Sequence, residues 1–289
     1  MIDCVADTGD TLGEGPVWDP AAGRIYWIDI KQRRLHSYDP SDRSQDHWDL
    51  PDQPGALAMQ AGGGLVLALA GGLAGFDPAT GELTRWVNPE AHLPGNRLND
   101  GATDRRGRFW FGSMDDEERD RTGALYRFDP DGTIHRVRDR IGIPNSLAFS
   151  PDGVVMYFAE TLDRTIFAYD YDQATGMPSR CRVFATTEEG YPDGSTVDAE
   201  GFLWNAQWGA HRVVRYAPDG SIARIVKMPV QNPTSCTFGG EDLDILFVTS
   251  ARQGIENPAD QPQAGGLFAS EVGTTGLVDA PWGESKKAS

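Results

Sequence analysis

Residues 142–170 read GIPNSLAFSPDGVVMYFAETLDRTIFAYD, and this stretch decides the fold. Its pattern predicts three short strands separated by turns, because runs of β-branched and aromatic residues are broken by Pro, Asp and Gly. The strands are expected at residues 146–150, 154–159 and 165–170. The same order of short strand, turn, Trp-bearing strand, turn and aromatic-ended strand returns at residues 195–220.

The stretch belongs to a set of six repeats. The centre of each second strand is aromatic or aliphatic, at Trp27, Leu67, Trp110, Tyr157, Trp204 and Phe247. These positions are 40, 43, 47, 47 and 43 residues apart. A period of this length, with several strands and Gly/Asp/Pro turns in each repeat, indicates a β-propeller. We therefore predict an all-β protein, a six-bladed β-propeller with four-stranded blades.

The two ends of the chain have separate expected roles. The repeats fill the sequence, so we expect residues 1–289 to form a single domain. The sixth repeat lacks an obvious fourth strand, and we expect the N-terminal residues 2–6 to supply it, which closes the ring and leaves no open sheet edge. The polar sequence of approximately residues 272–289 is expected to be a disordered C-terminal tail.

The composition narrows the class of partner. The chain carries 43 acidic and 26 basic residues, which give a formal net charge of −17. This charge would repel nucleic acid and anionic membranes, so we expect neither as a partner. It also disfavours an anionic substrate, whereas a neutral sugar derivative meets no such repulsion.

Cysteine usage and hydropathy indicate the compartment. Cys4, Cys181 and Cys236 are odd in number and far apart, which suits a reducing compartment and forms no metal motif. The first residues do not read as a signal peptide, and the most apolar stretch, residues 65–76, is too short to span a membrane. We expect a soluble cytoplasmic protein that is monomeric or weakly homo-oligomeric.

Four of the repeats carry a polar side chain at the same place before the end of the first strand. Each of these side chains stands five positions before an Asp or a Ser, and they are Glu14, Asn99, Asn145 and Asp193. Equivalent positions in a propeller face one mouth of the central channel, so the four side chains should converge there. Asn and Asp before a strand are usually turn formers, which is the alternative interpretation. Four polar side chains at the same position of four repeats favour a binding site instead, because one of them is a Glu, which has no special role in turns.

The residue types at this mouth suggest metal-assisted hydrolysis. Glu14, Asn145 and Asp193 offer hard oxygen ligands that suit Ca²⁺, Mg²⁺ or Mn²⁺, with Fe²⁺ or Zn²⁺ also possible. Three protein ligands leave positions open for water and substrate. Arg97 and Asn99 share one face of an extended segment and could grip a polyol or a carbonyl, although Arg97 could instead pair with an acid on the rim. Polarising a carbonyl and activating water points to ester or lactone hydrolysis.

Several motifs, in order along nearly the whole chain, resemble the senescence marker protein/regucalcin/gluconolactonase family. They are LGEGPVW at 12–18, RLNDG at 97–101, FGSM at 111–114, NSLAFS at 145–150, YPDG at 191–194 and CTFGG at 236–240. The resemblance implies a six-bladed propeller with one divalent metal ion held by the residues Glu14, Asn145 and Asp193. It also implies that Arg97 and Asn99 bind substrate.

Other segments look like the bacterial pentonolactonases of this family, such as the xylonolactonases that use Fe²⁺. These segments are WIDIKQR at 27–33 and PDQ at 51–53. The loop after Met114 reads Asp115-Asp116-Glu117, where relatives often have Ala-Glu-Glu. The resemblance gives Glu117 a sugar-binding role.

We therefore expect a metal-dependent hydrolase that opens a 1,4- or 1,5-aldonolactone, a pentonolactone or hexonolactone, to the aldonic acid. Asp193 is the expected base that deprotonates the attacking water. Two alternatives stay open. One is a related hydrolase of aryl esters or organophosphates, which a mostly apolar pocket would favour. The other is a metal-binding scaffold protein without turnover.

Overall fold

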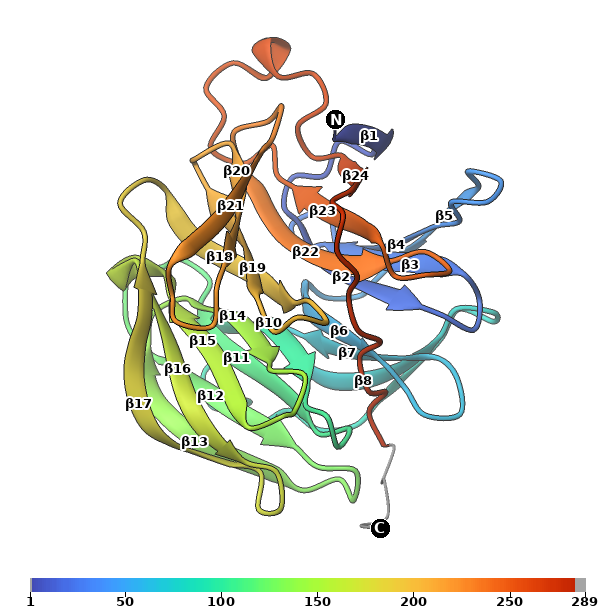
Figure 1. Cartoon of the computed structure of the whole chain (residues 1–289). Coiled ribbons are helices and arrows are strands. Elements are labelled where there is room, and N and C mark those ends of the chain that lie inside the picture. The colour runs from blue at the N-terminus through green and yellow to red at the C-terminus, as the bar shows by residue number, and fades with distance from the viewer. Residues whose placement is uncertain (1, 284–289) are drawn as a thin grey trace.

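The computed structural model describes residues 2–283 and shows a ring of antiparallel sheets (Figure 1). Within these residues there are six four-stranded sheets, which form the six blades of a propeller. The described residues also contain two short 3₁₀ turns, η1 (Thr161–Asp163) and η2 (Pro258–Asp260). None of the described helices is long and apolar enough to cross a membrane. The prediction of an all-β, six-bladed propeller is confirmed.

The strands follow the chain around the ring. Blade 1 contains β2 (Gly13–Asp19), β3 (Arg24–Asp29), β4 (Arg34–Tyr38) and β5 (Gln45–Asp49). Blade 2 contains β6 (Pro54–Met59), β7 (Leu65–Leu69), β8 (Gly72–Asp77) and β9 (Glu82–Arg85). Blade 3 contains β10 (Asn96–Thr103), β11 (Phe109–Asp115), β12 (Gly123–Phe128) and β13 (Ile134–Ile141).

The second half of the ring repeats this order. Blade 4 contains β14 (Pro144–Phe149), β15 (Val155–Glu160), β16 (Thr165–Asp172) and β17 (Met177–Thr186). Blade 5 contains β18 (Tyr191–Val197), β19 (Leu203–Trp208), β20 (Arg212–Tyr216) and β21 (Ile222–Lys227). Blade 6 contains β22 (Pro233–Gly239), β23 (Ile245–Ser250), β24 (Leu267–Glu271) and β1 (Asp3–Ala6).

Blade 6 is built from both ends of the chain. Its strand order is β1-β24-β23-β22, and β1 lies antiparallel to β24 with Asp3 opposite Ala269. This confirms that the N-terminal segment supplies the missing strand, although the strand begins at Asp3. Because the first and last strands share a sheet, the ring cannot open without breaking β1–β24 hydrogen bonds.

The apolar core lies between the blades. Six clusters of buried side chains in the described residues each join two neighbouring blades around the ring. The six predicted strand centres, from Trp27 to Phe247, are all buried. The core is therefore a ring of interfaces that surrounds a central channel, and the channel can be lined by polar groups.

Acidic residues mark the far end of the innermost strands. The Asp104 carboxylate accepts hydrogen bonds from the backbone N–H groups of Arg106 and Arg108, and Asp198 does the same for Glu200 and Phe202. These bonds fix the turn into the second strand. Since Asp104 and Asp198 end their strands, the polar residues five positions earlier lie at the opposite mouth of the channel.

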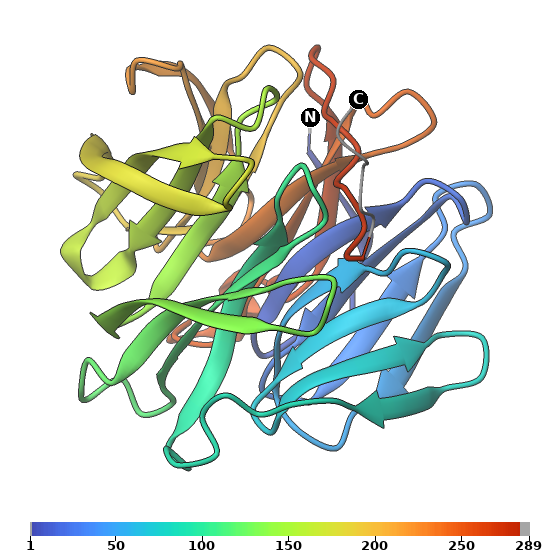
Figure 2. The ribbon, with the colours of Figure 1, turned by 90° about the horizontal axis from the view of Figure 1, so that it is seen from below.

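The segment after β24 packs against the propeller. Residues 272–283 cross the face opposite that polar mouth, and Figure 2 shows this red segment running from blade 6 towards blade 2. Along this path the carbonyl oxygen of Thr275 accepts a hydrogen bond from the backbone N–H of Ala199. The backbone N–H of Trp282 donates to the carbonyl oxygen of Met59. The Trp282 ring stacks on Phe128 with ring centroids 4.8 Å apart. The expected disordered tail is thus wrong for residues 272–283, and residues 284–289 lie outside the described residues.

Replacing the stacked ring tests how firmly this segment holds the blades together. We expect Trp282→Ala to lower the free energy of unfolding by about 2–4 kcal/mol, because the ring contacts that dock the segment after β24 on Trp86 and Phe128 are lost. Val278→Ala, at a half-exposed side chain in the same segment, is the matched control and should change it by less than about 0.5 kcal/mol. Urea unfolding measures both variants. An unchanged midpoint for Trp282→Ala would show that the ring contributes nothing.

Candidate functional site

The innermost strand of every blade is irregular at the place that the sequence marked. The pairing register shifts between Glu14 and Val17, Pro54 and Ala56, Asn99 and Gly101, Asn145 and Ala148, Pro192 and Ser195, and Pro233 and Cys236. Such bulges interrupt the alternation of a strand and re-aim a side chain. In four blades they turn a polar side chain towards the mouth of the channel.

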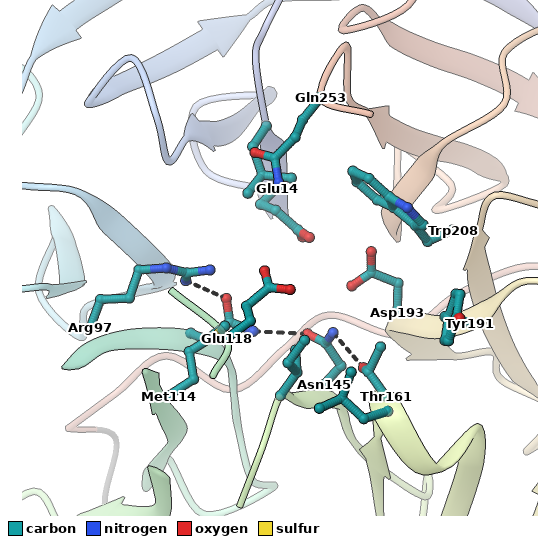
Figure 3. A pocket seen from close by; sticks show the side chains of 14 residues that line it. Glu14, Arg97, Met114, Glu118, Asn145, Thr161, Tyr191, Asp193, Trp208 and Gln253 are labelled. Atoms are coloured by element: carbon teal, nitrogen blue, oxygen red, sulfur yellow. Dashed lines mark hydrogen bonds between the residues drawn. The ribbon is translucent and has the colours of Figure 1, made fainter. Parts of the chain in front are cut away.

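These side chains line a cavity of about 290 Å³. The predicted residues Glu14, Arg97, Asn99, Asn145 and Asp193 all contribute to its wall. In Figure 3 the carboxyl groups of Glu14 and Asp193 point towards a common space above the Asn145 amide. The structure therefore brings together residues from four blades that are up to 179 positions apart in the sequence.

The sixth predicted residue, Glu117, does not line this cavity, and its neighbour Glu118 does. The cause is a tight turn in which the Asp115 carboxylate accepts hydrogen bonds from the backbone N–H groups of Glu117, Arg119 and Asp120. Glu118 adopts a left-handed backbone with φ of 57° inside this turn. Its carboxylate points into the cavity in Figure 3, so Glu118 replaces Glu117 as the candidate for contacting substrate.

The two candidate carboxylate ligands are buried and repel each other. Burial and the nearby Asp100 raise the pKa of Glu14 from 4.5 to about 8. Burial and the charge of Glu14 raise the pKa of Asp193 well above its ordinary value. Burial likewise raises the pKa of Asp100 to about 7. Without a cation, the cavity thus holds protons that carboxyl groups in water would lose.

Asp116 holds Arg97 in place at the cavity wall. The Arg97 Nε lies 2.7 Å from Asp116 Oδ1, and Lys31 and Gln53 also donate hydrogen bonds to the Asp116 carboxylate. The Arg97 Nη1 donates to Asn99 Oδ1 over 2.6 Å. Arg97 thus pairs with an acid, as the alternative interpretation expected, and it also lines the cavity.

The residues present fit a hard divalent cation. Two buried carboxyl groups and the Asn145 amide oxygen are the donors that Ca²⁺, Mg²⁺ and Mn²⁺ prefer, and positive charge would offset the repulsion that now raises the pKa of each acid. Within residues 2–283, no three His, Cys, Asp or Glu side chains form a group that could hold a metal ion. The amide of Asn145 would therefore have to complete the ligand set.

Besides Glu118, four polar or aromatic residues of the cavity wall were not among the predicted site residues. They are Thr161, Tyr191, Trp208 and Gln253. Thr161, Trp208 and Gln253 lie at or just beyond the ends of second strands, in blades 4, 5 and 6 respectively. Because the first two strands of a blade are antiparallel, the end of the second lies beside the start of the first. This position in each repeat was a signal that could have identified them.

Comparison with known proteins shows similarity over almost the whole chain. Residues 12–252 match the family described as SMP-30/Gluconolactonase/LRE-like region. An L-arabinolactonase of Azospirillum brasilense is 40% identical over 96% of this chain and 93% of that protein. A pentonolactonase of Haloferax volcanii is 38% identical over 94% of each chain. The structure of a calcium-binding protein, regucalcin of Agrobacterium tumefaciens, is similar with a TM-score of 0.92 at 35% identity over 96% of each chain.

The raised pKa values predict how the chelator-treated protein responds to pH. A carboxyl group whose folded-state pKa is raised favours folding most below its unfolded-state pKa and loses that contribution as pH rises through the folded-state value. For Glu14 this interval runs from pH 4.5 to about 8. We therefore expect the melting temperature in chelator to fall across this interval.

Two variants assign the effect to the cavity. Glu14→Gln should flatten the decline, whereas Glu82→Gln, at an exposed side chain in β9, should leave it as in the wild type. Thermal melts in buffers between pH 5 and pH 8 measure both. A melting temperature that rises over this interval would contradict the buried pair.

Proposed function

The chain belongs to the SMP-30/gluconolactonase/LRE-like family, and from this we propose that it is a sugar lactonase that hydrolyses an aldonolactone to the aldonic acid. The family resemblance expected from the sequence motifs is confirmed. The observation that supports the proposal best is the cavity itself, which gathers Glu14, Asn145 and Asp193 together with Arg97 and Asn99. Ring-opening of an ester needs a base, a group that stabilises carbonyl charge and groups that orient hydroxyls.

We assign the metal-binding role to Glu14, Asn145 and Asp193. The donor set suits one divalent ion, Ca²⁺, Mg²⁺, Mn²⁺, Fe²⁺ or Zn²⁺, and the Agrobacterium relative is described as calcium-binding. When bound, such an ion supplies Lewis-acid stabilisation of charge on a substrate oxygen. The side chains around the ion carry out proton transfer and orient the substrate.

Asp193 serves as the general base. Attack of water on the lactone carbonyl carbon forms a C–O bond, and the proton lost by the water passes to the Asp193 carboxylate. When the bond to the ring oxygen breaks, that proton returns to the alkoxide, which becomes a hydroxyl group of the aldonic acid. A bound cation would offset the repulsion from Glu14 that raises the pKa of Asp193 in the metal-free protein, and the ionised carboxylate can then accept the proton.

The lining favours a neutral polyhydroxylated substrate. The Arg97 guanidinium can donate to a sugar oxygen, the Asn99 amide lies beside it, and Glu118 can accept from sugar hydroxyls. Three of the titratable lining residues are acidic, and the one basic residue, Arg97, is already paired with Asp116. An anionic substituent on the sugar would meet net repulsion here. Eight of the 14 lining residues carry charged, amide or hydroxyl side chains without an aromatic ring, and these can bond to sugar hydroxyls.

Removing the base tests the mechanism. Asp193→Asn keeps an oxygen ligand but loses the basic carboxylate, so turnover at saturating Mn²⁺ should fall by about 10²–10⁴-fold. The assay follows acid release from 1,4- and 1,5-aldonolactones with a pH indicator, beside phenyl acetate, which should react much more slowly. Asp242→Asn, at an exposed side chain beyond the far end of β22, should keep wild-type turnover.

Each outcome has a distinct meaning. A folded and metal-loaded Asp193→Asn protein with near wild-type turnover would assign deprotonation to another group. Faster hydrolysis of phenyl acetate than of any aldonolactone would favour the aryl-ester alternative. A wild-type protein that binds Mn²⁺ and opens no lactone would support the scaffold alternative.

The two neighbouring glutamates provide a matched test of the substrate contact. Glu118→Gln should raise KM for the lactone about tenfold, because a hydrogen bond to a charged acceptor weakens. Glu117→Gln should leave KM unchanged, since Glu117 lies outside the cavity wall. Steady-state kinetics on both variants decide between them. If Glu117→Gln carries the larger effect, the assignment reverts to the one expected from sequence.

A further inference from the structure

A chain of hydrogen bonds crosses the cavity wall from blade 3 to blade 5. The Asn99 Nδ2 donates to Asn145 Oδ1 over 3.1 Å, and the Asn145 Nδ2 donates to Thr161 Oγ1 over 2.9 Å. The Thr161 hydroxyl in turn donates to the carbonyl oxygen of Pro192 over 2.8 Å. Asn145 and Thr161 are both buried, so these polar groups have little access to water as an alternative partner. Figure 3 marks the bond between Asn145 and Thr161 with a dashed line.

The direction of every bond in this chain is fixed by its two ends. Arg97 can only donate, so the side-chain oxygen of Asn99 faces it and the Asn99 Nδ2 faces Asn145. The carbonyl of Pro192 can only accept, so the single hydroxyl hydrogen of Thr161 is committed to it. Thr161 must then accept from Asn145, and only the amide nitrogen of Asn145 can donate. The amide of Asn145 therefore has one allowed orientation, with its oxygen away from Thr161.

We propose that Thr161 is a positioning residue that holds the Asn145 amide with its oxygen towards the cation site. The inference rests on the proposed metal site formed by Glu14, Asn145 and Asp193. If the amide turned over, an N–H donor would replace the oxygen ligand, and cation binding would weaken. Groups that orient a metal ligand typically change metal affinity by 10–100-fold when they are removed.

The local structure of Thr161 suits this role. It begins the η1 turn directly after β15, and its backbone N–H donates to the carbonyl oxygen of Ile143. The preceding Glu160 carboxylate accepts hydrogen bonds from the N–H groups of Gly142 and Ile143. These bonds fix the backbone of Thr161 against the strand that carries Asn145. Through Pro192, the residue before Asp193, the same hydroxyl also ties blade 4 to blade 5.

The test compares Mn²⁺ binding by chelator-stripped variants in a calorimetric titration. Thr161→Val keeps the shape of the side chain and loses the acceptor, so the Kd for Mn²⁺ should rise about tenfold or more. Thr161→Ser restores the hydroxyl, and its Kd should stay within about threefold of the wild type. A role in folding alone would shift the melting temperature of the metal-free protein and leave Mn²⁺ affinity unchanged in the folded fraction.

A second background isolates the orientation of the amide. In Asn145→Asp the two carboxylate oxygens are equivalent, so no orientation has to be chosen. Adding Thr161→Val to Asn145→Asp should therefore change the Kd for Mn²⁺ by less than about threefold. This non-additivity would show that Thr161 acts through the amide of Asn145. An equal loss of affinity in both backgrounds would overturn the proposal, and so would unchanged binding by Thr161→Val alone.

The titration also distinguishes a wrong metal site from a wrong role for Thr161. A wild-type protein that binds no Mn²⁺ would overturn the site and, with it, the role given to Thr161. Tight binding by both the wild type and Thr161→Val would overturn only the role of Thr161.

Discussion

Two carboxyl groups buried side by side at the mouth of a channel impose the main physical constraint on this protein. Glu14 and Asp193 lose hydration and repel each other, which raises the pKa of both. A flexible fold would relax by letting the two acids move apart. The closed ring prevents this, because blades 1 and 5, which carry them, are separated by blade 6, and blade 6 combines β1 with β24. The ring thus keeps two like charges where one cation could satisfy both.

Much of this arrangement could be predicted from the sequence, and the reason is the repeat. The turn-forming acids Asp104 and Asp198 mark the end of an innermost strand, so counting back five positions reaches the same mouth in different blades. That count found Glu14, Asn145 and Asp193 without knowledge of any distance. It depends only on a backbone pattern that recurs, including a bulge at the equivalent place in every blade.

The features that escaped prediction depend on single side chains in irregular segments. Glu118 and Glu117 are adjacent acids in one loop, and only the hydrogen bonds to Asp115 decide which one turns inward. The segment after β24 reads as polar, yet one aromatic residue, Trp282, docks it across the ring between Trp86 and Phe128. Thr161 lies in a short turn, and the role of its hydroxyl group can be inferred only when its hydrogen-bond partners from blades 4 and 5 are known. The repeat marks the position of Thr161 at the end of a second strand, but the contacts of Glu118, Trp282 and the Thr161 hydroxyl do not recur from blade to blade.

Blades 2 and 6 have no predicted site residue at their bulge, and they show that the backbone, and not the metal-binding side chains, defines the cavity. Blade 2 has the same bulge, but a Cβ at Gly55 would lie 1.9 Å from the carbonyl oxygen of Leu98, so no side chain fits there. In blade 6 the Thr234 hydroxyl donates to the Gly13 carbonyl oxygen and so ties that blade to the start of β2. The bulge is present even in blades that carry no metal-binding side chain. Its formation therefore does not depend on a bound ion. Substitutions at Glu14, Asn145 or Asp193 should therefore alter binding and chemistry while the propeller retains its shape.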